Sequence, residues 1–168
     1  MCACIGTIPV AYGELHRLQE LHLDVNEFSG VIPYTFSNLN RLEQITLSDN
    51  LLTGSLPSFI QFYHDLRLLD VGNNLLTGTV PLYLSGVSTN PLNPNLNMNN
   101  LHEIYINNNQ LNGFIPSTIC TLDRLEVLVF NDNPNITCYD TCLAKYRSRM
   151  EMKINVGDAV QCGSCKFY

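Results

Sequence analysis

Several features that mark common protein classes are missing from this sequence. No uninterrupted apolar stretch reaches the roughly 18 residues that a membrane-spanning helix requires. The first nine residues lack the basic start and the apolar stretch of a secretory signal, so secretion cannot be inferred from the chain directly. Glycine-rich phosphate loops and protein-kinase signatures are also absent. We therefore predict no membrane span in this chain and no nucleotide site of these types.

Positive charge is scarce and unevenly distributed. The 9 Lys and Arg residues are outnumbered by 15 Asp and Glu residues, which gives a net charge of −6. No basic cluster with interleaved aromatic residues forms a phosphate-binding stripe, so nucleic acid is not expected as a partner. Residues 144–168 hold 5 basic and 2 acidic groups, against 4 and 13 in residues 1–143. The C-terminal tail is therefore a different kind of segment.

The sequence is rich in Leu and Asn, and both recur with a fixed period. A leucine opens each repeat, in steps of 24, 24, 35 and 24 residues, at Leu18, Leu42, Leu66, Leu101 and Leu125. An asparagine ladder keeps the same steps, at Asn26, Asn50, Asn74, Asn109 and Asn133. A Gly-x-hydrophobic-Pro unit recurs with the same period, at Gly6/Pro9, Gly30/Pro33, Gly54/Pro57, Gly78/Pro81 and Gly113/Pro116. Self-similarity with a fixed period of this length indicates a repeat architecture.

Each residue type in the repeat has a structural role. Leu21 and Leu23 alternate with His22 and Asp24, which is the two-residue period of a short strand with one buried face. An inward Asn26 amide can pair backbone groups at the turn after that strand. The glycine allows positive φ, and the proline fixes φ where the chain runs on without a ladder hydrogen bond. Each repeat thus predicts one coil that returns beside the last.

These residues resemble the leucine-rich repeat family, in the 24-residue form LxxLxLxxNxLxGxIPxxLxxLxx that is typical of plant receptor ectodomains and polygalacturonase-inhibiting proteins. The resemblance implies an α/β solenoid, a right-handed superhelix with a concave parallel β-sheet and with 3₁₀ or short helices on its convex side. Residues 1–137 are expected to form an array of about five coils. Residues 138–168 are expected to form a cysteine-containing C-terminal cap.

Two departures from the repeat carry further expectations. The chain starts in the middle of a repeat at Gly6, with no preceding strand or recognisable amino-terminal cap, so we expect a fragment of a longer array. The extra segment, residues 85–100, cannot form a regular element and is predicted to bulge outward. A tolerated surface insertion is favoured over a ligand-contacting arm, because loops absorb length at little entropic cost.

Cysteines gather toward the end of the chain. The resemblance implies that disulfides close the last coil, and the candidates are Cys120, Cys138, Cys142, Cys162 and Cys165. Spacing does not determine the pairing. Our hypothesis is that Cys120 pairs with Cys142 and that Cys138 pairs with Cys162. The last four cysteines also fit the C-x3-C-x19-C-x2-C spacing of a zinc ribbon, which predicts a reducing compartment. Disulfides are favoured over zinc, and no metal is assigned.

Two more features belong to the tail. Asn135 opens an Asn-Ile-Thr sequon and is a candidate for N-glycosylation. Residues 143–152 are predicted to form a short amphipathic helix that covers the core. The basic residues that this helix would place in water are Lys145, Arg147 and Arg149.

The outward positions of the predicted strands form a grid that can vary without disturbing the core, and such repeats usually bind ligands there. This grid is acidic and polar toward its start and apolar at Val127 and Val129 toward its end. A basic or hydroxyl-rich ligand, such as a peptide or glycan, would suit the first part. The candidate ligand-binding residues are Glu20, His22, Asp24, Gln44, Thr46, Ser48, Asp70, Glu103, Tyr105, Asn107 and Val129.

Catalysis is not predicted. The nearest candidate group is His22, Ser48 and Asp70, which would lie on an open surface with no pocket to shift a pKa and no oxyanion donors. The spacing of Asp24, Asp49 and Asp70 matches no calcium-binding loop. We therefore expect neither an enzyme nor a cofactor.

The sequence thus predicts a recognition module, extracellular or at the cell surface, that binds a protein, peptide or glycan. One alternative is the ectodomain remnant of a receptor kinase whose catalytic domain is missing. The other is an intracellular scaffold with a zinc-stapled C-terminus. A longer protein that contains this chain can still be anchored in a membrane.

Overall fold

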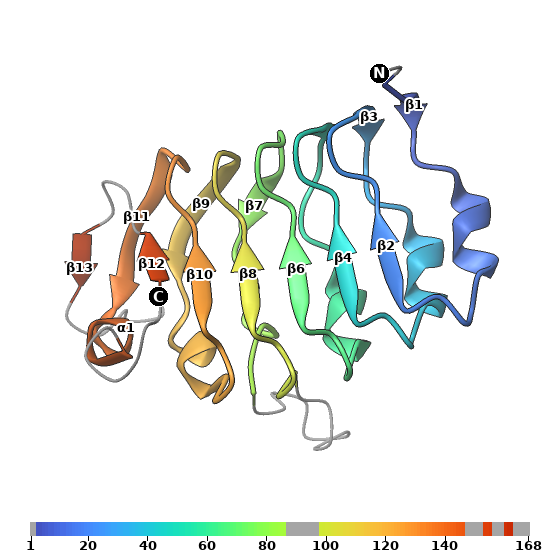
Figure 1. The fold of residues 1–168 in the computed structure, drawn as a ribbon. Coiled ribbons are helices and arrows are strands. Elements are labelled where there is room, and N and C mark those ends of the chain that lie inside the picture. The colour runs from blue at the N-terminus through green and yellow to red at the C-terminus, as the bar shows by residue number, and fades with distance from the viewer. Residues whose placement is uncertain (1–2, 87–97, 147–152, 156–159, 163–168) are drawn as a thin grey trace.

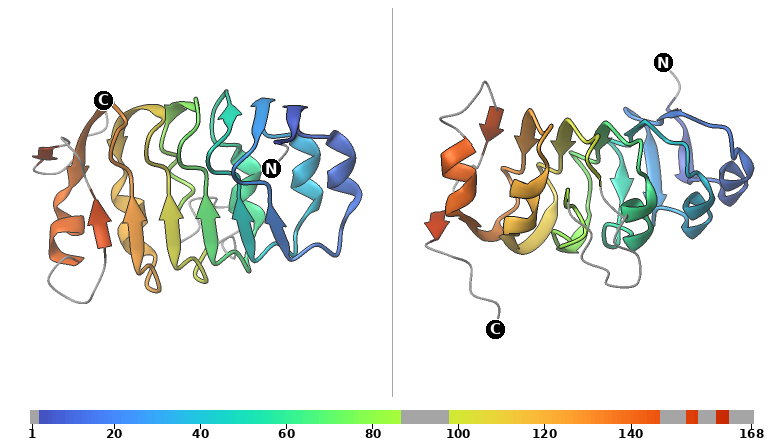
Figure 2. Two further views of the ribbon diagram at one scale, coloured as in Figure 1. Left: turned by 45° about the horizontal axis from the view of Figure 1, so that its top comes forward. Right: turned by 90° about the horizontal axis from the view of Figure 1, so that it is seen from below.

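The repeats stack as successive coils of a solenoid, which Figures 1 and 2 show from three directions. The computed structural model describes residues 3–86, 98–146, 153–155 and 160–162. The long sheet has six parallel strands: β2 (Glu20–His22), β4 (Gln44–Thr46), β6 (Leu68–Asp70), β8 (Glu103–Tyr105), β10 (Val127–Val129) and β12 (Lys153–Asn155). Their order is β12-β10-β8-β6-β4-β2. This is the parallel sheet expected on the concave side.

The strands of the long sheet pair repeat by repeat. Leu21 lies beside Ile45, Ile45 beside Leu69, and Leu69 beside Ile104. These central residues are buried, whereas the residues on either side of them are half-buried or exposed. The structure therefore has the two-residue alternation that the leucine spacing predicts.

Short 3₁₀ helices line the other side of the coils (Figure 2). They are η1 (Val10–Glu14), η2 (Tyr34–Asn38), η3 (Ser58–Phe62) and η4 (Ser117–Thr121). Each follows the proline of a Gly-x-hydrophobic-Pro unit, whose φ lies between −61° and −71°. Because a proline fixes φ near this value, it starts a short helix at the same place in each of these coils.

Two further parallel sheets were not predicted from the sequence. One contains β1 (Ile5–Thr7), β3 (Glu27–Gly30) and β5 (Leu51–Leu52). The other, which we call the second sheet, contains β7 (Thr77–Thr79), β9 (Gln110–Ile115), β11 (Asn135–Asp140) and β13 (Val160–Cys162), in the order β13-β11-β9-β7. The repeat glycine lies within these strands or directly after them. Gly54, two residues after β5, has a φ of +79°, and a Cβ there would lie 2.9 Å from the Val31 Cγ1. Only glycine adopts this backbone shape without strain.

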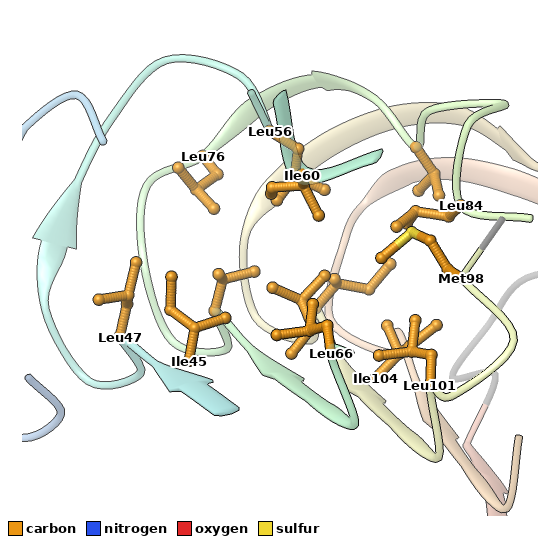
Figure 3. Packing of buried hydrophobic residues seen from close by; sticks show 14 of the residues in the cluster. Ile45, Leu47, Leu56, Ile60, Leu66, Leu76, Leu84, Met98, Leu101 and Ile104 are labelled. Carbon is orange, nitrogen blue, oxygen red and sulfur yellow. The ribbon is translucent and has the colours of Figure 1, made fainter. Parts of the chain in front are cut away.

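One continuous apolar core fills the inside of the coils. Figure 3 shows part of it, with Ile45 and Leu66 facing Ile60 across the interior. Tyr63 is fully buried, and its hydroxyl donates to the Phe36 carbonyl oxygen at 2.7 Å. Burial raises the pKa of this phenol above its ordinary value, so the tyrosine stays neutral and keeps its hydrogen bond.

The ladder asparagines lie in a row, one at the turn after each of the strands β2, β4, β6, β8 and β10. The interior members are 4% to 7% exposed, and they are Asn50, Asn74, Asn109 and Asn133. The Asn74 Oδ1 accepts from the Leu52 N–H of the preceding coil at 2.9 Å, and its Nδ2 donates to three backbone carbonyls. Each asparagine thus satisfies its own turn and ties it to the coil before it.

The insertion leaves and re-enters the stack at one point. The Met98 N–H donates to the Ser85 carbonyl oxygen at 3.0 Å, and the Met98 side chain is buried near Leu84 (Figure 3). Strands β6 and β8 keep the register of the other repeats, with Asp70 beside Tyr105. The extra residues therefore do not shift the long sheet. The predicted outward bulge falls on residues 87–97, which lie outside the described residues.

The tail contributes strands as well as a helix. The helix α1 (Thr141–Tyr146) packs against η4, β11 and β13. It begins two residues before the predicted start, where the Asp140 Oδ1 accepts from the Cys142 N–H at 2.9 Å. Residues 147–152 and the side chain of Lys145 lie outside the described part, so the expected solvent-facing Lys145, Arg147 and Arg149 stay a prediction. In the residues that the structure describes, no helix is long and apolar enough to cross a membrane.

Candidate ligand-binding face

The candidate site is the outer face of the long sheet, which consists of three columns of side chains. The first column is Glu20, Gln44, Leu68, Glu103 and Val127; the second is His22, Thr46, Asp70, Tyr105 and Val129; the third is Asp24, Ser48, Gly72, Asn107 and Asn131. All except the buried Gly72 are half-buried or exposed. The structure therefore places every predicted ligand-binding residue on one surface.

A chain of hydrogen bonds links the first two strands of this outer face. The Thr46 hydroxyl donates to the Asp24 Oδ1 at 2.8 Å, and the His22 Nδ1 lies 2.9 Å from the same hydroxyl oxygen. Because a hydroxyl has one hydrogen, His22 Nδ1 must be the donor in the second contact. The His22 Nε2 lies 3.5 Å from the Glu20 Oε2. These four side chains hold one another in place before any ligand arrives.

Asp70 occupies the middle of the outer face. Its Oδ1 accepts from the Gly72 N–H at 3.0 Å, and the Ser48 hydroxyl also bonds its carboxylate. Burial raises the pKa of Asp70 above its ordinary value, and the negative charges of Asp49 and Asp24 raise it further. The two hydrogen bonds act in the opposite direction. Asp70 is thus a partly desolvated acid in a negative field.

The C-terminal part of the outer face is less charged. The Tyr105 hydroxyl donates to the Glu103 Oε2 at 2.8 Å. Partial desolvation raises the pKa of Tyr105 to about 12, with the Glu103 carboxylate adding to the shift. The half-buried Val127 and Val129 follow on β10. A ligand that crosses the whole outer face would therefore meet acids and hydroxyls first and apolar side chains last.

Among the side chains that the structure describes, Lys and Arg do not offset the acids of the outer face. In the described part of the chain, no Lys or Arg pairs with the carboxylates of Asp24, Asp49 or Asp70. Arg67 pairs instead with Glu43, at 3.3 Å between Nη2 and Oε2, beside the outer face rather than on it. The first half of the outer face therefore has an uncompensated negative charge.

The candidate catalytic group is not assembled. His22 bonds Thr46 rather than Ser48, while Ser48 bonds Asp70. The nucleophile and the base of a triad need a direct hydrogen bond, and the side chains of Ser48 and His22 each have another partner.

Cys120 and Cys142 form a disulfide that joins η4 to α1. This is the pairing expected for these two residues. Because Cys142 is bonded to Cys120, it cannot serve as a ligand of the alternative zinc ribbon. The side chain of Cys162 and all of Cys165 lie outside the described residues, so a Cys138–Cys162 disulfide stays a prediction.

A second ladder, which was not predicted from the sequence, borders the outer face. Its members all have a φ between +48° and +56°, and they are Val25, Asp49, Asn73, Asn108 and Asp132. The Asn73 Nδ2 donates to the Asp49 Oδ1 at 2.9 Å, and the Asn108 Nδ2 donates to the Asn73 Oδ1 at 3.0 Å. Asp and Asn tolerate positive φ, whereas the β-branched Val25 does not. The missed signal was an Asp or Asn before four of the five ladder asparagines.

Comparison with family models supports the reading of the repeats. Residues 16–76 match one model described as leucine rich repeat, and residues 100–122 match a second model with the same description. Together these matches cover half of the chain. The chain belongs to the leucine-rich repeat family. None of the curated proteins matches it.

Solved structures of plant receptor ectodomains share this leucine-rich repeat fold. The ectodomain of the Arabidopsis thaliana receptor kinase GASSHO1/SCHENGEN3, in complex with CASPARIAN STRIP INTEGRITY FACTOR 2, is 29% identical, with a TM-score of 0.74 over 92% of this chain and 17% of that one. The SOBIR1 ectodomain from the same plant is 28% identical, with a TM-score of 0.68 over 79% of this chain and 65% of that one.

A third similar structure was solved with a peptide. The Arabidopsis HAESA ectodomain, in complex with an N-terminally extended IDA peptide hormone ligand, is 27% identical, with a TM-score of 0.66 over 82% of this chain and 24% of that one. The chain thus spans between 17% and 65% of the length of these three structures. The similarity supports ligand binding as the general role of such repeats.

Proposed function

We propose that this leucine-rich repeat chain is an extracellular recognition module without catalytic activity, and that the outer face of the long sheet binds a peptide. The broader class of ligands that we propose also includes a protein segment or a glycan with the same chemistry. The observation that carries the proposal is the outward side chains of the long sheet, which differ in charge and polarity from coil to coil while the buried residue at the centre of each repeat strand is always Leu or Ile. The ligand complexes of the similar ectodomains support it.

The chemistry of the outer face favours a ligand with a basic end and an apolar end. Asp24, Asp49 and Asp70 share a negative field that no described Lys or Arg offsets, so a ligand cation would be attracted there. Val127 and Val129 offer apolar contact at the other end. An extended peptide reaches both regions without a deep pocket.

The disulfide supports the extracellular location. Disulfides persist in oxidising compartments and are rare in the cytosol, and the Cys120–Cys142 bond removes a ligand from the zinc alternative. Membership of a larger receptor kinase is the second candidate, because the similar structures include receptor-kinase ectodomains. The full-length transcript tests it: a downstream membrane helix and kinase signatures would support that role, and a stop codon directly after this chain would refute it.

A display library of random linear peptides tests the binding proposal. We expect enrichment of peptides with Lys or Arg near one end, with binding that weakens as salt concentration rises. Asp70→Asn and Tyr105→Ala should each reduce binding about tenfold. Thr79→Ala, an exposed change on β7 of the second sheet, is the matched control and should leave binding unchanged.

Glycan blocking makes the test sharper. Gln44→Asn creates an Asn-Ile-Thr sequon at residues 44–46 in β4, on the outer face. When the variant is glycosylated during secretion, a bulky sugar should cover the outer face and abolish peptide binding. The outer face would be refuted as the binding surface if selected peptides still bound the glycosylated variant. It would also be refuted if Thr79→Ala weakened peptide binding as much as Asp70→Asn does.

A further inference from the structure

We propose that Asn135 carries an N-linked glycan, and that the glycan must be attached before strand β11 pairs with its neighbours. The sugar would then cover the C-terminal end of the second sheet and leave the outer face of the long sheet open. This inference depends on the extracellular location proposed above but not on the identity of the ligand.

The sequon is arranged so that a glycan fits the folded chain. Asn135 and Thr137 are exposed, while Ile136 between them is 5% exposed and belongs to the core. In an extended strand, alternate residues point to opposite sides, so Asn135 faces water while Ile136 anchors the strand. A sugar on the Asn135 Nδ2 would therefore displace no core side chain.

The neighbours of Asn135 leave room for the sugar. Asn135 lies beside Asn112 of β9, and Asn112 lies beside Thr79 of β7. Both neighbours are exposed, uncharged and polar. These strands belong to the second sheet, which is separate from the long sheet with its ligand-binding candidates. A glycan at Asn135 is thus compatible with peptide binding, in contrast to one introduced in β4.

The folded sequon is already engaged, which sets the order of events. The Thr137 hydroxyl donates to the Gly113 carbonyl oxygen at 3.2 Å, and the first two sequon residues pair with β9, while β13 pairs with β11 only beyond the sequon. A transferase must bind the sequon backbone and the Thr hydroxyl in its own cleft. Once β11 joins the sheet, the Thr137 hydroxyl is bonded and one edge of the sequon backbone is paired with β9, so we infer that transfer occurs on the unpaired chain.

The reaction needs one co-reactant, a lipid-pyrophosphate-linked oligosaccharide. A bond forms between the Asn135 Nδ2 and C1 of the first sugar, while the bond from C1 to the pyrophosphate oxygen breaks. The lipid pyrophosphate leaves, and the amide nitrogen gives up one proton to a base. No atom is oxidised or reduced.

Secretion of the full chain behind a cleavable leader, from a eukaryotic host that glycosylates, tests the site. We expect chain from the medium to lose one glycan on treatment with peptide N-glycosidase, and mass spectrometry to locate that glycan on Asn135. Asn135→Gln and Thr137→Ala should each abolish the shift, whereas Thr137→Ser should retain it. An unmodified Asn135 in secreted chain, or a shift that survives Asn135→Gln, would overturn the site.

The order of events has its own test. Unglycosylated chain, either folded with the disulfide intact or denatured and reduced, is offered to microsomal transferase with the lipid-linked oligosaccharide. We expect modification of the denatured chain and at least a tenfold lower yield for the folded chain. Equal yields would overturn the order of events. Because peptide binding is measured separately on Asn135→Gln, failure of the glycan proposal is distinguishable from failure of the binding function.

Discussion

An interior coil and the first complete coil carry the same repeat, but their ladder asparagines differ in burial and in the number of hydrogen bonds. Asn74 lies between two coils, is 6% exposed and makes four hydrogen bonds, whereas Asn26 is half-buried and makes three. The second ladder differs in the same way, because Val25 stands where later coils have Asp or Asn. Burial in a solenoid is thus supplied by neighbouring coils and not by the repeat itself.

The largest effect is expected at the other end of the stack, where a covalent bond reinforces the last coil. The double change Cys120→Ala and Cys142→Ala should lower the free energy of unfolding by about 3 kcal/mol, because the disulfide closes a loop between residues 22 positions apart. Urea denaturation of both chains measures it. A loss below about 1 kcal/mol would mean that α1 and the tail strands hold this end without the bond.

The next largest losses of stability are expected when the ladder asparagines are replaced, and an interior asparagine should matter more than one at the edge of the stack. Asn74→Ala leaves the buried Leu52 N–H and several carbonyls without partners, so it should destabilise the chain by about 2 kcal/mol. Asn26→Ala should cost about 1 kcal/mol because water replaces the lost partners at the edge. Thr46→Ala on the outer face is the control and should leave folding nearly unchanged. Equal losses for all three variants would contradict the contrast between interior and edge.

Val25 offers a change in the opposite direction. Val25→Asn should stabilise the chain by about 1 kcal/mol, because Asn tolerates the φ of +56° that strains a β-branched residue. The reverse change in an interior coil, Asp49→Val, should destabilise by at least as much, since it also removes the bond from Asn73. Thermal unfolding of the two variants distinguishes backbone strain at Val25 from a general tolerance of valine in this column.

The smallest effect concerns Asp70 and depends on pH. Its pKa is raised in the folded chain above the ordinary value of 3.8, so the folded state binds the proton more tightly than the unfolded state does. The associated stability is fully present below pH 3.8 and is lost as pH rises through the raised pKa. Asp70→Asn should therefore stabilise the chain by about 0.5 kcal/mol at pH 7 and bring no gain in strong acid. A gain that is independent of pH would contradict this origin.

The sequence revealed the strands of the long sheet more clearly than any other element. Leu21, Ile45 and Leu69 lie at matched positions on three successive repeats, and a two-residue alternation around each specifies a strand with one buried face. The two smaller sheets were not predicted because glycines such as Gly30 and Gly54 interrupt that alternation. Strand β12 escaped because its pairing with β10 joins segments that no repeat relates.

The candidate site was predictable in position but not in detail. Outward residues such as His22 and Thr46 follow from the leucine spacing, since every second residue of a strand faces away from the core. The links between them do not follow, because the His22–Thr46–Asp24 chain depends on side chains that meet across two strands. The raised pKa of Asp70 likewise depends on desolvation by its surroundings.

The sequence by itself determined the coil: its length, its buried leucines, its asparagine and the proline that starts each 3₁₀ helix, because all of these are local requirements of one turn of chain. Tertiary structure decided which asparagines are buried and how the strands of the two smaller sheets are paired. It also decided where the tail strands join the sheets and how the acids of the outer face influence one another. Those properties arise between coils, where the distance between two groups is set by stacking and not by their separation along the chain.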